Sequence, residues 1–297
     1  MARSRTTPGP APRDPDRRDV PPIDAETQLY AVIGHPVAHS LSPRMQNAAF
    51  RAAGKNAAYV ALDVPRPRLA EALAGLHAAG FRGLNVTLPH KEEALRLSHS
   101  ATPAARAAGA ANTLRRGRDG WEAEATDGGG FLAWMEELGL RAEGARVLLL
   151  GAGGAARAIA AALAAGGAAS IRIVNRHEER ATAVAEAAAA VAAGATRVDT
   201  GSWERADPEA KFDFLVRALS VEAVSAEERR WWDAVAPGSC VLDLNYGARA
   251  RAAREEAGRA GLRFEDGLAL LVEQGALSYE FWTGERAPRA AMQEALS

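Results

Sequence analysis

A glycine-rich segment near the middle of the chain has residue types and a spacing suited to binding phosphate. Residues 151–156 read Gly-Ala-Gly-Gly-Ala-Ala and match the pattern G-x-G-x-x-A between an expected strand and an expected helix. The first glycine permits a tight turn, the second lets backbone N–H groups approach a pyrophosphate, and the last small residue keeps helix and strand close. The helix N-terminus adds positive potential. The pattern predicts a dinucleotide site that includes Gly151, Gly153, Gly154 and Ala155.

The residues after the next expected strand indicate which dinucleotide is bound. An enzyme that uses NAD usually carries an acidic residue there, which binds the ribose 2′-hydroxyl. This chain has Asn175 and Arg176 at that point, and Arg180 follows one helical turn later. Guanidinium groups can pair with the 2′-phosphate of NADP, often through two hydrogen bonds. We therefore expect NADP as the cofactor; a solvated helix surface is the alternative interpretation of Arg180.

The segments around these residues alternate between strand and helix. Such alternation is typical of a parallel sheet covered by helices. We therefore predict a Rossmann-type NADP-binding domain over residues 127–266. Its expected strands are 146–150, 171–174, 212–216 and 241–244, and its expected helices are 131–138, 155–165 and 178–193.

The N-terminal half alternates in the same way, which predicts a second α/β domain with a mainly parallel sheet. We assign residues 28–126 to this substrate-binding catalytic domain and expect residues 267–297 to complete it. Ser42 is the expected N-cap of a helix that begins at Pro43. The other expected elements are strands at 29–33, 58–64, 84–88, 111–115 and 121–125, and helices at 68–79, after Lys91, and from Asp266 to about Trp282.

The bulk composition argues against several classes of partner. The chain has 297 residues and a net charge of −1, so neither nucleic acid nor an anionic membrane is an expected partner. It has no run of about 18 apolar residues that would predict a membrane span. Residues 1–27 are rich in Pro, Arg and Asp and lack the apolar core of a signal peptide, so we predict a disordered tail and a cytoplasmic protein.

Few residues are candidates for disulfides or metal binding. Cys240 is the only cysteine and lies in an apolar run, which predicts a buried structural thiol. His35, His39 and His90 lie in the loops between expected elements but lack metal-ligand spacing. No metal is therefore expected.

Several segments occur in the order and spacing found in one enzyme family. From about Tyr30 to Gly284 the chain resembles the shikimate dehydrogenases. The segments that carry the resemblance are Ser40-Leu41-Ser42-Pro43, Asn85-Val86-Thr87-Leu88-Pro89-His90-Lys91, Ala111-Asn112-Thr113, Thr126-Asp127-Gly128, the glycine motif, Asn175-Arg176 and Gln274. The resemblance implies a two-domain enzyme of chorismate and aromatic amino acid biosynthesis. This enzyme would use NADPH to reduce 3-dehydroshikimate reversibly to shikimate, in a cleft between its domains that closes by a hinge motion.

The resemblance assigns Lys91 and Asp127 to catalysis. A lysine ammonium can give the ketone oxygen its proton and can stabilise developing negative charge, whereas an arginine holds its proton too tightly. Lysine is also rare here, since it occurs only at positions 55, 91 and 211 of an arginine-rich chain. Asp127 would orient the ammonium and hydrogen-bond the substrate hydroxyl. Because such a pair titrates together, neither residue is assigned as the sole acid or base.

The resemblance also assigns the residues that hold the ligands. A small polyhydroxylated acid needs hydroxyl and amide partners rather than an apolar pocket. The substrate-binding residues would be Ser40, Ser42, Asn85, Thr87, Asn112, Tyr246 and Gln274, and Gly267 would join the cofactor-binding residues. For Ser42 the alternative is helix capping alone, and for Asn112 it is a turn. Gln274 lies on a largely apolar helix face, where an unpaired amide would be costly.

Three short segments depart from the family pattern. Ala125 stands where an Asn usually precedes Thr-Asp-Gly, residues 217–219 replace an Asn-Ala-Thr segment beside the nicotinamide, and Gly247-Ala248 follow Tyr246 where a Tyr-x-Pro is usual. These changes motivate two alternatives to the main hypothesis. One is a quinate/shikimate dehydrogenase that uses NAD, and the other is a weakly active or non-catalytic shikimate-binding paralogue. A monomer and a homodimer are both compatible with the sequence.

Overall fold

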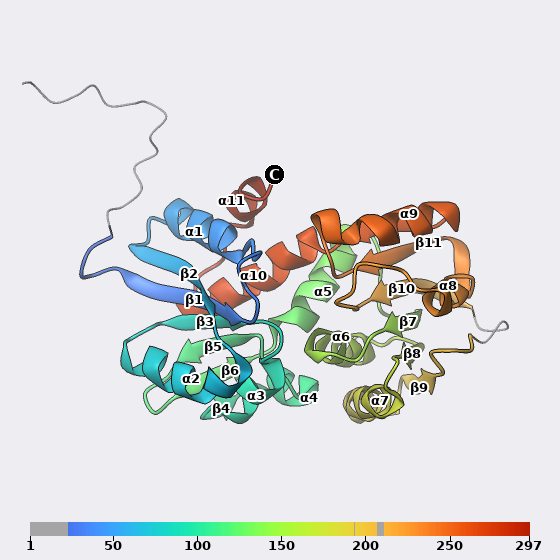
Figure 1. Ribbon diagram of the computed structural model, residues 1–297, viewed down its shortest axis with the longest axis horizontal. Helices are drawn as coiled ribbons and strands as arrows, with labels where there is room; N and C mark the ends of the chain where they lie inside the picture. The colour runs from blue at the N-terminus through green and yellow to red at the C-terminus, as the bar shows by residue number, and fades with distance from the viewer. Residues whose placement is uncertain (1–22, 193, 207–210) are drawn as a thin grey trace, which may run out of the picture.

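The computed structural model describes residues 23–192, 194–206 and 211–297. Most of the predicted disordered tail, residues 1–22, therefore lies outside the described residues. Two six-stranded sheets lie side by side, one built from the N-terminal and one from the C-terminal part of the chain (Figure 1). In the described ranges, no helix combines the length and apolar character needed to cross a membrane.

The first sheet is mainly parallel, as predicted. Its strands are β1 (Gln28–Gly34), β2 (Ala57–Asp63), β3 (Gly83–Val86), β4 (Ser100–Ala101), β5 (Thr113–Arg116) and β6 (Trp121–Glu124), in the order β2-β1-β3-β5-β6-β4. Strand β1 pairs in parallel with both β2 and β3. Strand β5 runs antiparallel to its two neighbours, β3 and β6. The hairpin of β5 and β6 thus adds the antiparallel part to the parallel core of the sheet.

Strand β1 is buried on both faces, which explains its continuous apolar sequence. Successive side chains of a strand point to opposite faces, and a strand covered on both sides reads as an unbroken hydrophobic run. Ala31 and Ile33 pack in one core, whereas Tyr30 and Val32 pack in another. The helices of this half are α1 (Ser42–Ala52), η1 (Arg66–Arg68), α2 (Leu69–Ala78), α3 (Lys91–Arg96) and α4 (Pro103–Ala108).

The second sheet is entirely parallel, as a Rossmann-type domain requires. Its strands are β7 (Arg146–Leu150), β8 (Ser170–Val174), β9 (Arg197–Gly201), β10 (Phe212–Arg217), β11 (Val235–Asp243) and β12 (Arg263–Asp266), in the order β12-β11-β10-β7-β8-β9. The order reverses between β7 and β10, the point at which open α/β sheets bind ligands. The helices after β6 are α5 (Thr126–Glu137), α6 (Gly154–Ala165), α7 (Glu178–Ala192), α8 (Ala226–Trp232), η2 (Gly247–Ala250), α9 (Arg251–Arg259), α10 (Leu268–Thr283) and α11 (Arg289–Glu294). Of these, α10 and α11 pack in a core of the first sheet.

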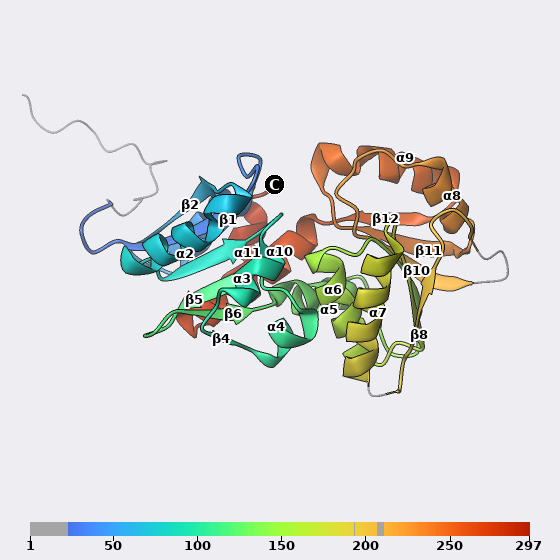
Figure 2. The ribbon, with the colours of Figure 1, turned by 60° about the horizontal axis from the view of Figure 1, so that its bottom comes forward.

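Helices α5 and α10 lie against each other between the two sheets (Figure 2). Their close approach depends on glycine, since a Cβ at Gly130 would lie 2.6 Å from the backbone N of Gln274. A Cβ at Gly128 would likewise lie 2.7 Å from the carbonyl O of Ala158 in α6. Helix α5 packs into the core of the second sheet, and α10 packs into a core of the first. The two helices therefore join the halves of the molecule.

Three local predictions are wrong. Ser42 is the first residue of α1 and makes no capping hydrogen bond, because Leu41 occupies the N-cap position. Helix α5 begins at Thr126 rather than at residue 131, so Asp127 lies in its first turn. The strand predicted over 84–88 ends at Val86, and Leu88 is 54% exposed. Thr87 N still donates to the carbonyl O of Ile33, and the carbonyl O of Leu88 accepts from His35 N, so the chain follows β1 for two residues past the end of β3.

Candidate active site

Lys91 and Asp127 form an ion pair between the two halves of the molecule. Lys91 begins α3 just after β3, and Asp127 lies in the first turn of α5. Lys91 Nζ donates to Asp127 Oδ2 at 2.5 Å, and the two side chains are 14% and 12% exposed. A charge-assisted hydrogen bond in such a largely enclosed place holds the ammonium in a fixed direction. The two residues predicted to be catalytic are thus in direct contact.

Asn112 connects this pair to α10. Its Nδ2 lies 2.9 Å from Asp127 Oδ1 and 3.1 Å from Gln274 Oε1, and its Oδ1 accepts from the backbone N–H of Thr126 at 2.7 Å. Asn112 is only 3% exposed. Four of the predicted site residues, Lys91, Asp127, Asn112 and Gln274, therefore lie in one hydrogen-bonded array.

Asn85 is buried, and both ends of its side-chain amide are hydrogen-bonded within the protein. It is 7% exposed, its Oδ1 accepts from the Tyr59 hydroxyl at 2.7 Å, and its Nδ2 donates to Ser278 Oγ at 2.9 Å. The Ser278 hydroxyl also pairs with that of Thr113 at 2.7 Å. The sequence did not predict Tyr59 or Ser278 as site residues, and Thr113 entered only as part of the segment Ala111-Asn112-Thr113, without a role of its own. Ser278 could have been found, since it follows Gln274 by one helical turn on the same face.

Three further substrate-side candidates, Ser40, Ser42 and Thr87, lie near the start of α1 and the end of β3. Ser40 Oγ accepts from the backbone N–H of Ser42 at 3.3 Å. The Ser42 side chain lies near the Tyr59 hydroxyl, which donates to Asn85 Oδ1 at 2.7 Å. Within the described chain the Thr87 hydroxyl has no hydrogen-bond partner, so it is available to a ligand.

The predicted phosphate loop joins β7 to α6. Gly151 has a φ of 118°, a conformation that side chains disfavour, and a Cβ there would collide with the carbonyl O of Ala218. A Cβ at Gly153 would meet no atom within 4 Å, so the backbone borders open space where a pyrophosphate fits. Ala155 follows in the first turn of α6, whose N-terminus supplies N–H donors. The residues present therefore fit a dinucleotide.

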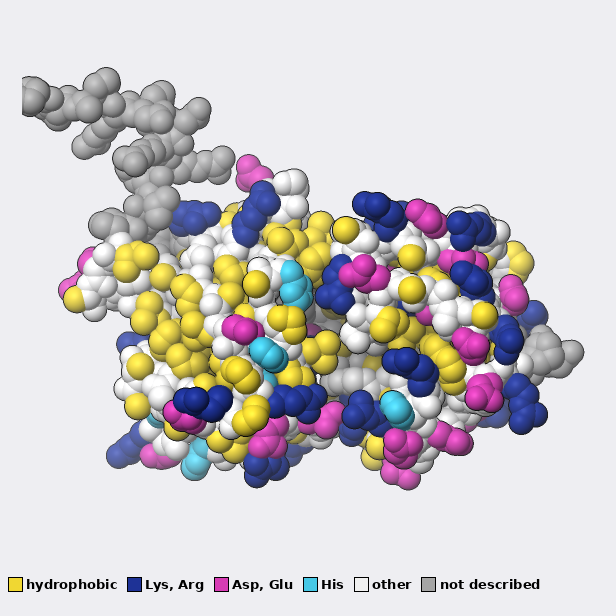
Figure 3. Space-filling view, viewed as in Figure 1, with side chains coloured by type: hydrophobic (Ala, Val, Ile, Leu, Met, Phe, Trp, Pro, Cys, Tyr) yellow, Lys and Arg dark blue, Asp and Glu magenta, His cyan; other side chains and the backbone are white. Residues whose placement is uncertain are grey.

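Arg176 and Arg180 lie beyond the carboxyl end of β8 and are exposed. Neither side chain has a hydrogen bond or an ion pair with another described residue, so both charges are available to an anion. Asn175 Nδ2 donates to the carbonyl O of His177 at 3.0 Å, which shapes the turn between them. Lys and Arg side chains also lie along the lower edge of the molecule where its two halves meet (Figure 3).

Tyr246 and Gly267 lie beyond the carboxyl ends of β11 and β12. Burial raises the pKa of Tyr246, and a hydrogen bond from the backbone N–H of Leu41 partly offsets this effect. Tyr246 thus reaches from the second half of the molecule to the segment that carries Ser40 and Ser42. Gly267 N donates to the carbonyl O of Asn245 at 2.9 Å, and a Cβ at Gly267 would collide with the carbonyl O of Leu244.

Two buried groups near these elements have shifted titrations. His90, next to Lys91, is 1% exposed, and burial lowers its pKa. Its Nε2 lies 2.6 Å from the carbonyl O of Val64, so the neutral ring donates a hydrogen bond there. Cys240 is buried as expected, and burial raises its pKa to about 11. Its thiol is therefore protonated and unreactive at neutral pH.

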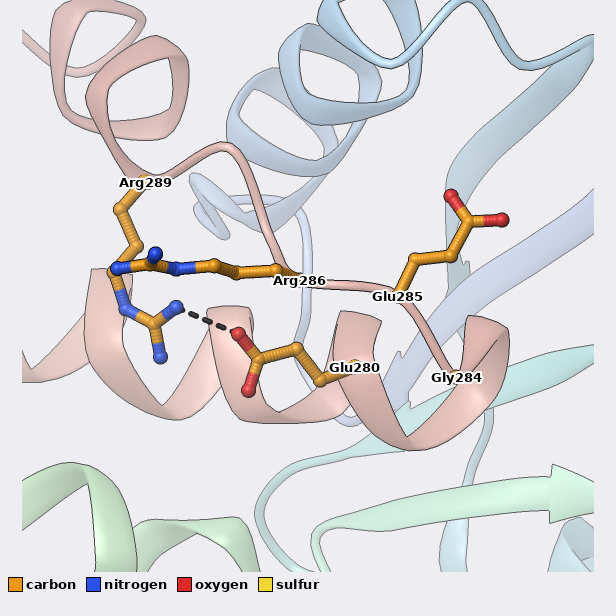
Figure 4. A pocket seen from close by; sticks show the side chains of 5 residues that line it. All are labelled: Glu280, Gly284, Glu285, Arg286 and Arg289. Atoms are coloured by element: carbon orange, nitrogen blue, oxygen red, sulfur yellow. Dashed lines mark hydrogen bonds and ion pairs between the residues drawn. The ribbon is translucent and has the colours of Figure 1, made fainter.

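A hollow elsewhere on the surface lies between the end of α10 and α11 (Figure 4). It is lined by Glu280, Gly284, Glu285, Arg286 and Arg289. Arg289 Nη1 donates to Glu280 Oε1 at 2.6 Å, so two of the lining charges neutralise each other. None of the predicted site residues lines this hollow.

The family models and a curated relative agree on the family to which the chain is similar. Residues 32–114 match the family described as the shikimate dehydrogenase substrate binding domain, residues 135–207 match shikimate / quinate 5-dehydrogenase, and residues 267–296 match the shikimate 5′-dehydrogenase C-terminal domain. The shikimate dehydrogenase (NADP(+)) of Anaeromyxobacter dehalogenans strain 2CP-C is 48% identical over 277 residues, which cover 92% of this chain and 97% of that protein.

Solved structures agree with the sequence relatives. Shikimate 5-dehydrogenase from Thermus thermophilus, in complex with NADP(H) and shikimate, has a TM-score of 0.77 and 33% identity, and the match covers 91% of this chain and 98% of that one. Shikimate 5-dehydrogenase from Listeria monocytogenes, in complex with shikimate and NAD, has a TM-score of 0.80 and 29% identity, with coverage of 93% and 98%. By its sequence, its fold and its relatives, the chain belongs to the shikimate dehydrogenase family.

Proposed function

We propose that the protein is an NADP-dependent shikimate dehydrogenase that reversibly reduces 3-dehydroshikimate to shikimate for the biosynthesis of chorismate and aromatic amino acids. The observation that carries this proposal is the array of Lys91, Asp127, Asn112 and Gln274 beside the phosphate loop. A Cβ at Gly154 would lie 3.1 Å from Lys91 Cβ, so the ammonium-bearing side chain and the loop adjoin. A substrate held at Lys91 is therefore next to the predicted dinucleotide site.

The chain's own groups suit the proton-transfer half of this reaction. The dinucleotide, when bound, supplies the hydride that reduces the ketone carbon. Lys91 Nζ then gives a proton to the ketone oxygen and stabilises the negative charge that develops there. Asp127 holds the ammonium through Oδ2 at 2.5 Å. In the reverse direction the same pair takes the proton from the substrate hydroxyl.

Amide and hydroxyl groups orient the substrate. Asn112 and Gln274, 3.1 Å apart, would hold ring hydroxyls beside Asp127. Ser40 and Ser42 at the start of α1 would bind the carboxylate, and Thr87 and Tyr246 would add further hydroxyl partners for the substrate. Asn85 would act mainly by fixing Tyr59 and Ser278 behind the array, because its amide is already hydrogen-bonded.

The charges beyond β8 favour NADP. Arg176 and Arg180 would pair with the 2′-phosphate. Gly151, Gly153, Gly154 and Ala155 would hold the pyrophosphate, and Asn175 and Gly267 would contact the rest of the cofactor. A quinate/shikimate dehydrogenase that uses NAD is the second candidate, favoured by the Listeria monocytogenes relative crystallised with NAD. The absence of an acidic side chain at positions 175 and 176 argues against it.

We further propose a division of labour along the chain. Residues 28–126, completed by 267–297, would form the substrate-binding catalytic domain, and residues 127–266 the NADP-binding domain. The protein would act in the cytoplasm, as a monomer or a homodimer, on small molecules rather than on nucleic acid or membranes.

Absorbance at 340 nm with purified protein, shikimate and either NADP or NAD tests the activity. Reduction of NADP at a much higher kcat/KM than NAD supports the proposal. Equal kcat/KM with the two cofactors would contradict the NADP assignment. Shikimate binding with no reduction of either cofactor would favour the non-catalytic paralogue, which the departures at Ala125, residues 217–219 and Gly247-Ala248 motivate.

A further inference from the structure

Arg217 is a completely buried arginine, and it begins the segment 217–219 that differs from the family's Asn-Ala-Thr. Arg217 ends β10, and its side chain has no exposed area. Its Nε donates to Glu228 Oε1 at 2.7 Å, and its Nη1 donates to Asp243 Oδ2 at 3.2 Å. The two carboxylates are 1% and 0% exposed. Burying such a triad costs solvation free energy that its own attraction does not reliably recover, so stability alone is a weak explanation for it.

The same guanidinium holds the loop that follows β10. Arg217 Nη2 donates to the carbonyl O of Val221 at 2.9 Å and to that of Ala223 at 3.3 Å. Both acceptors lie in residues 218–225, which connect β10 to α8. The planar, forked guanidinium suits several acceptors in fixed directions. One buried side chain therefore ties together two strand ends, a helix and the loop.

Two further side chains extend this hold on the loop. Asn245 Nδ2 donates to the carbonyl O of Leu219 at 2.8 Å and is itself fixed by Asp243 Oδ1 at 3.0 Å. Arg249 Nη2 donates to the carbonyl O of Ser220 at 2.8 Å. Four consecutive or nearly consecutive carbonyl groups of the loop thus accept hydrogen bonds from side chains of the protein. In the described chain, by contrast, no protein group accepts from the amide N–H groups of residues 219–223, which leaves these donors to water or a ligand.

The loop lies at the ligand-binding point of the sheet. Strand order reverses between β7 and β10, so the loops after these two strands border one crevice. The loop begins there, since Ala218 N donates to the carbonyl O of Leu150 at 2.8 Å and a Cβ at Gly151 would collide with the carbonyl O of Ala218. Arg176 and Arg180 lie beyond β8, on the other side of β7. A dinucleotide whose 2′-phosphate lies at β8 would therefore extend its nicotinamide half towards the β10 loop.

We propose that Arg217 is a positioning residue for the dinucleotide: together with Glu228 and Asp243, it keeps residues 218–225 in place as the wall of the crevice that receives the nicotinamide half. This inference rests on the proposed function. It gives the buried triad a role in cofactor affinity, because a loop that is already ordered loses less conformational freedom when the ligand binds.

The test compares NADP and shikimate binding in matched variants. Arg217→Met alone leaves two buried carboxylates unpaired and risks unfolding. A second variant, Arg217→Met/Glu228→Gln/Asp243→Asn, removes all three charges and keeps an acceptor for Asn245. The control is Arg146→Met, which breaks the half-exposed pair with Asp213 at the opposite end of the same sheet. Thermal unfolding identifies folded variants, and calorimetric titration gives Kd for NADP and for shikimate.

The expected result is specific to the cofactor. The folded triple variant should bind NADP about tenfold more weakly. Without the hydrogen bonds of Arg217, residues 218–225 would adopt the binding-competent conformation in only a fraction of the molecules. Its Kd for shikimate should stay within about twofold of wild type, and amide exchange in residues 218–225 should become faster. Arg217→Lys, which keeps the positive charge, should bind NADP more tightly than Arg217→Met but more weakly than wild type. A folded triple variant with wild-type NADP affinity would overturn the inference, whereas a wild type that binds no NADP would overturn the proposed function as well.

Discussion

Lys91 packs directly against Gly154 of the phosphate loop. A Cβ at position 154 would lie 3.1 Å from Lys91 Cβ and 3.2 Å from Lys91 Cδ. Lys91 belongs to the half of the molecule built on the first sheet and Gly154 to the half built on the second. The position of the proposed proton donor relative to the dinucleotide therefore depends on the absence of a side chain at residue 154.

We predict that Gly154→Ala lowers kcat by about 10- to 100-fold, because a displacement of about 1 Å at a reacting group can cost that much. Steady-state assays at 340 nm with saturating ligands measure the effect. Gly258→Ala is the matched control, since a Cβ at this helical position meets no atom within 4 Å. An unchanged kcat in Gly154→Ala would show that Lys91 does not need this contact.

Replacement of the ion pair should abolish most turnover while leaving the protein folded. Lys91→Ala and Asp127→Asn should each lower kcat by about 10²- to 10⁴-fold, the range expected for general acid–base groups. Lys91→Ala should still bind shikimate, as calorimetric titration can show. Lys55→Ala, which removes a surface pair with Glu285 at 2.8 Å, provides the control. Undiminished turnover in Lys91→Ala would remove this residue from the mechanism.

The two exposed arginines beyond β8 should determine the choice of cofactor. Arg176→Ala and Arg180→Ala should each lower kcat/KM for NADP by about 10- to 100-fold, because each removes a hydrogen bond to a charged group. The kcat/KM for NAD, which lacks the 2′-phosphate, should change little. Arg68→Ala, which removes only an exposed pair with Glu71, controls for the loss of surface charge. Equal losses with both cofactors would assign these arginines a general rather than a discriminating role.

Buried His90 should make the fold sensitive to mild acid. Burial lowers its pKa in the folded protein below the ordinary value of about 6.5. The unfolded chain therefore takes up the proton first, so this contribution to stability is complete above about pH 6.5 and is lost as the pH falls through the folded pKa. Urea unfolding at about pH 7.5 and 5.5 should show a smaller loss for His90→Gln than for wild type. Identical losses would rule out His90 as the cause.

The phosphate loop between β7 and α6 could be predicted from the sequence because it is a local motif. The phosphate loop reads directly as a strand, a glycine-rich turn and a helix, because its chemistry depends on neighbours in the chain. The start of α5 was missed because three glycines, residues 128–130, have low helix propensity. Packing overrides that propensity here, since a side chain at Gly130 would collide with Gln274 of α10.

The hydrogen bonds that hold the site residues in place could not be predicted from the sequence, because they join residues far apart in the chain. Ser278 meets Thr113 although 165 residues separate them, and Tyr59 meets Asn85 across two strands that are not neighbours in the sheet. The carboxylate partners of Arg217 come from α8 and β11, which no local pattern connects to the end of β10. Such contacts depend on how the elements pack, whereas sequence patterns chiefly report on the elements themselves.

The contact between α5 and α10 also bears on the hinge motion that we predict between the two halves of the molecule. In the described chain, β6 leads into α5 and β12 leads into α10, so both passages between the halves run through these helices. A rotation of one half against the other would therefore pivot about these two helices, where displacements would be smallest. Asp127 and Gln274 lie on the two pivoting helices, joined through Asn112. We therefore expect opening to move the phosphate loop away from Lys91, while Asp127, Asn112 and Gln274 keep their relative positions because they are hydrogen-bonded to one another.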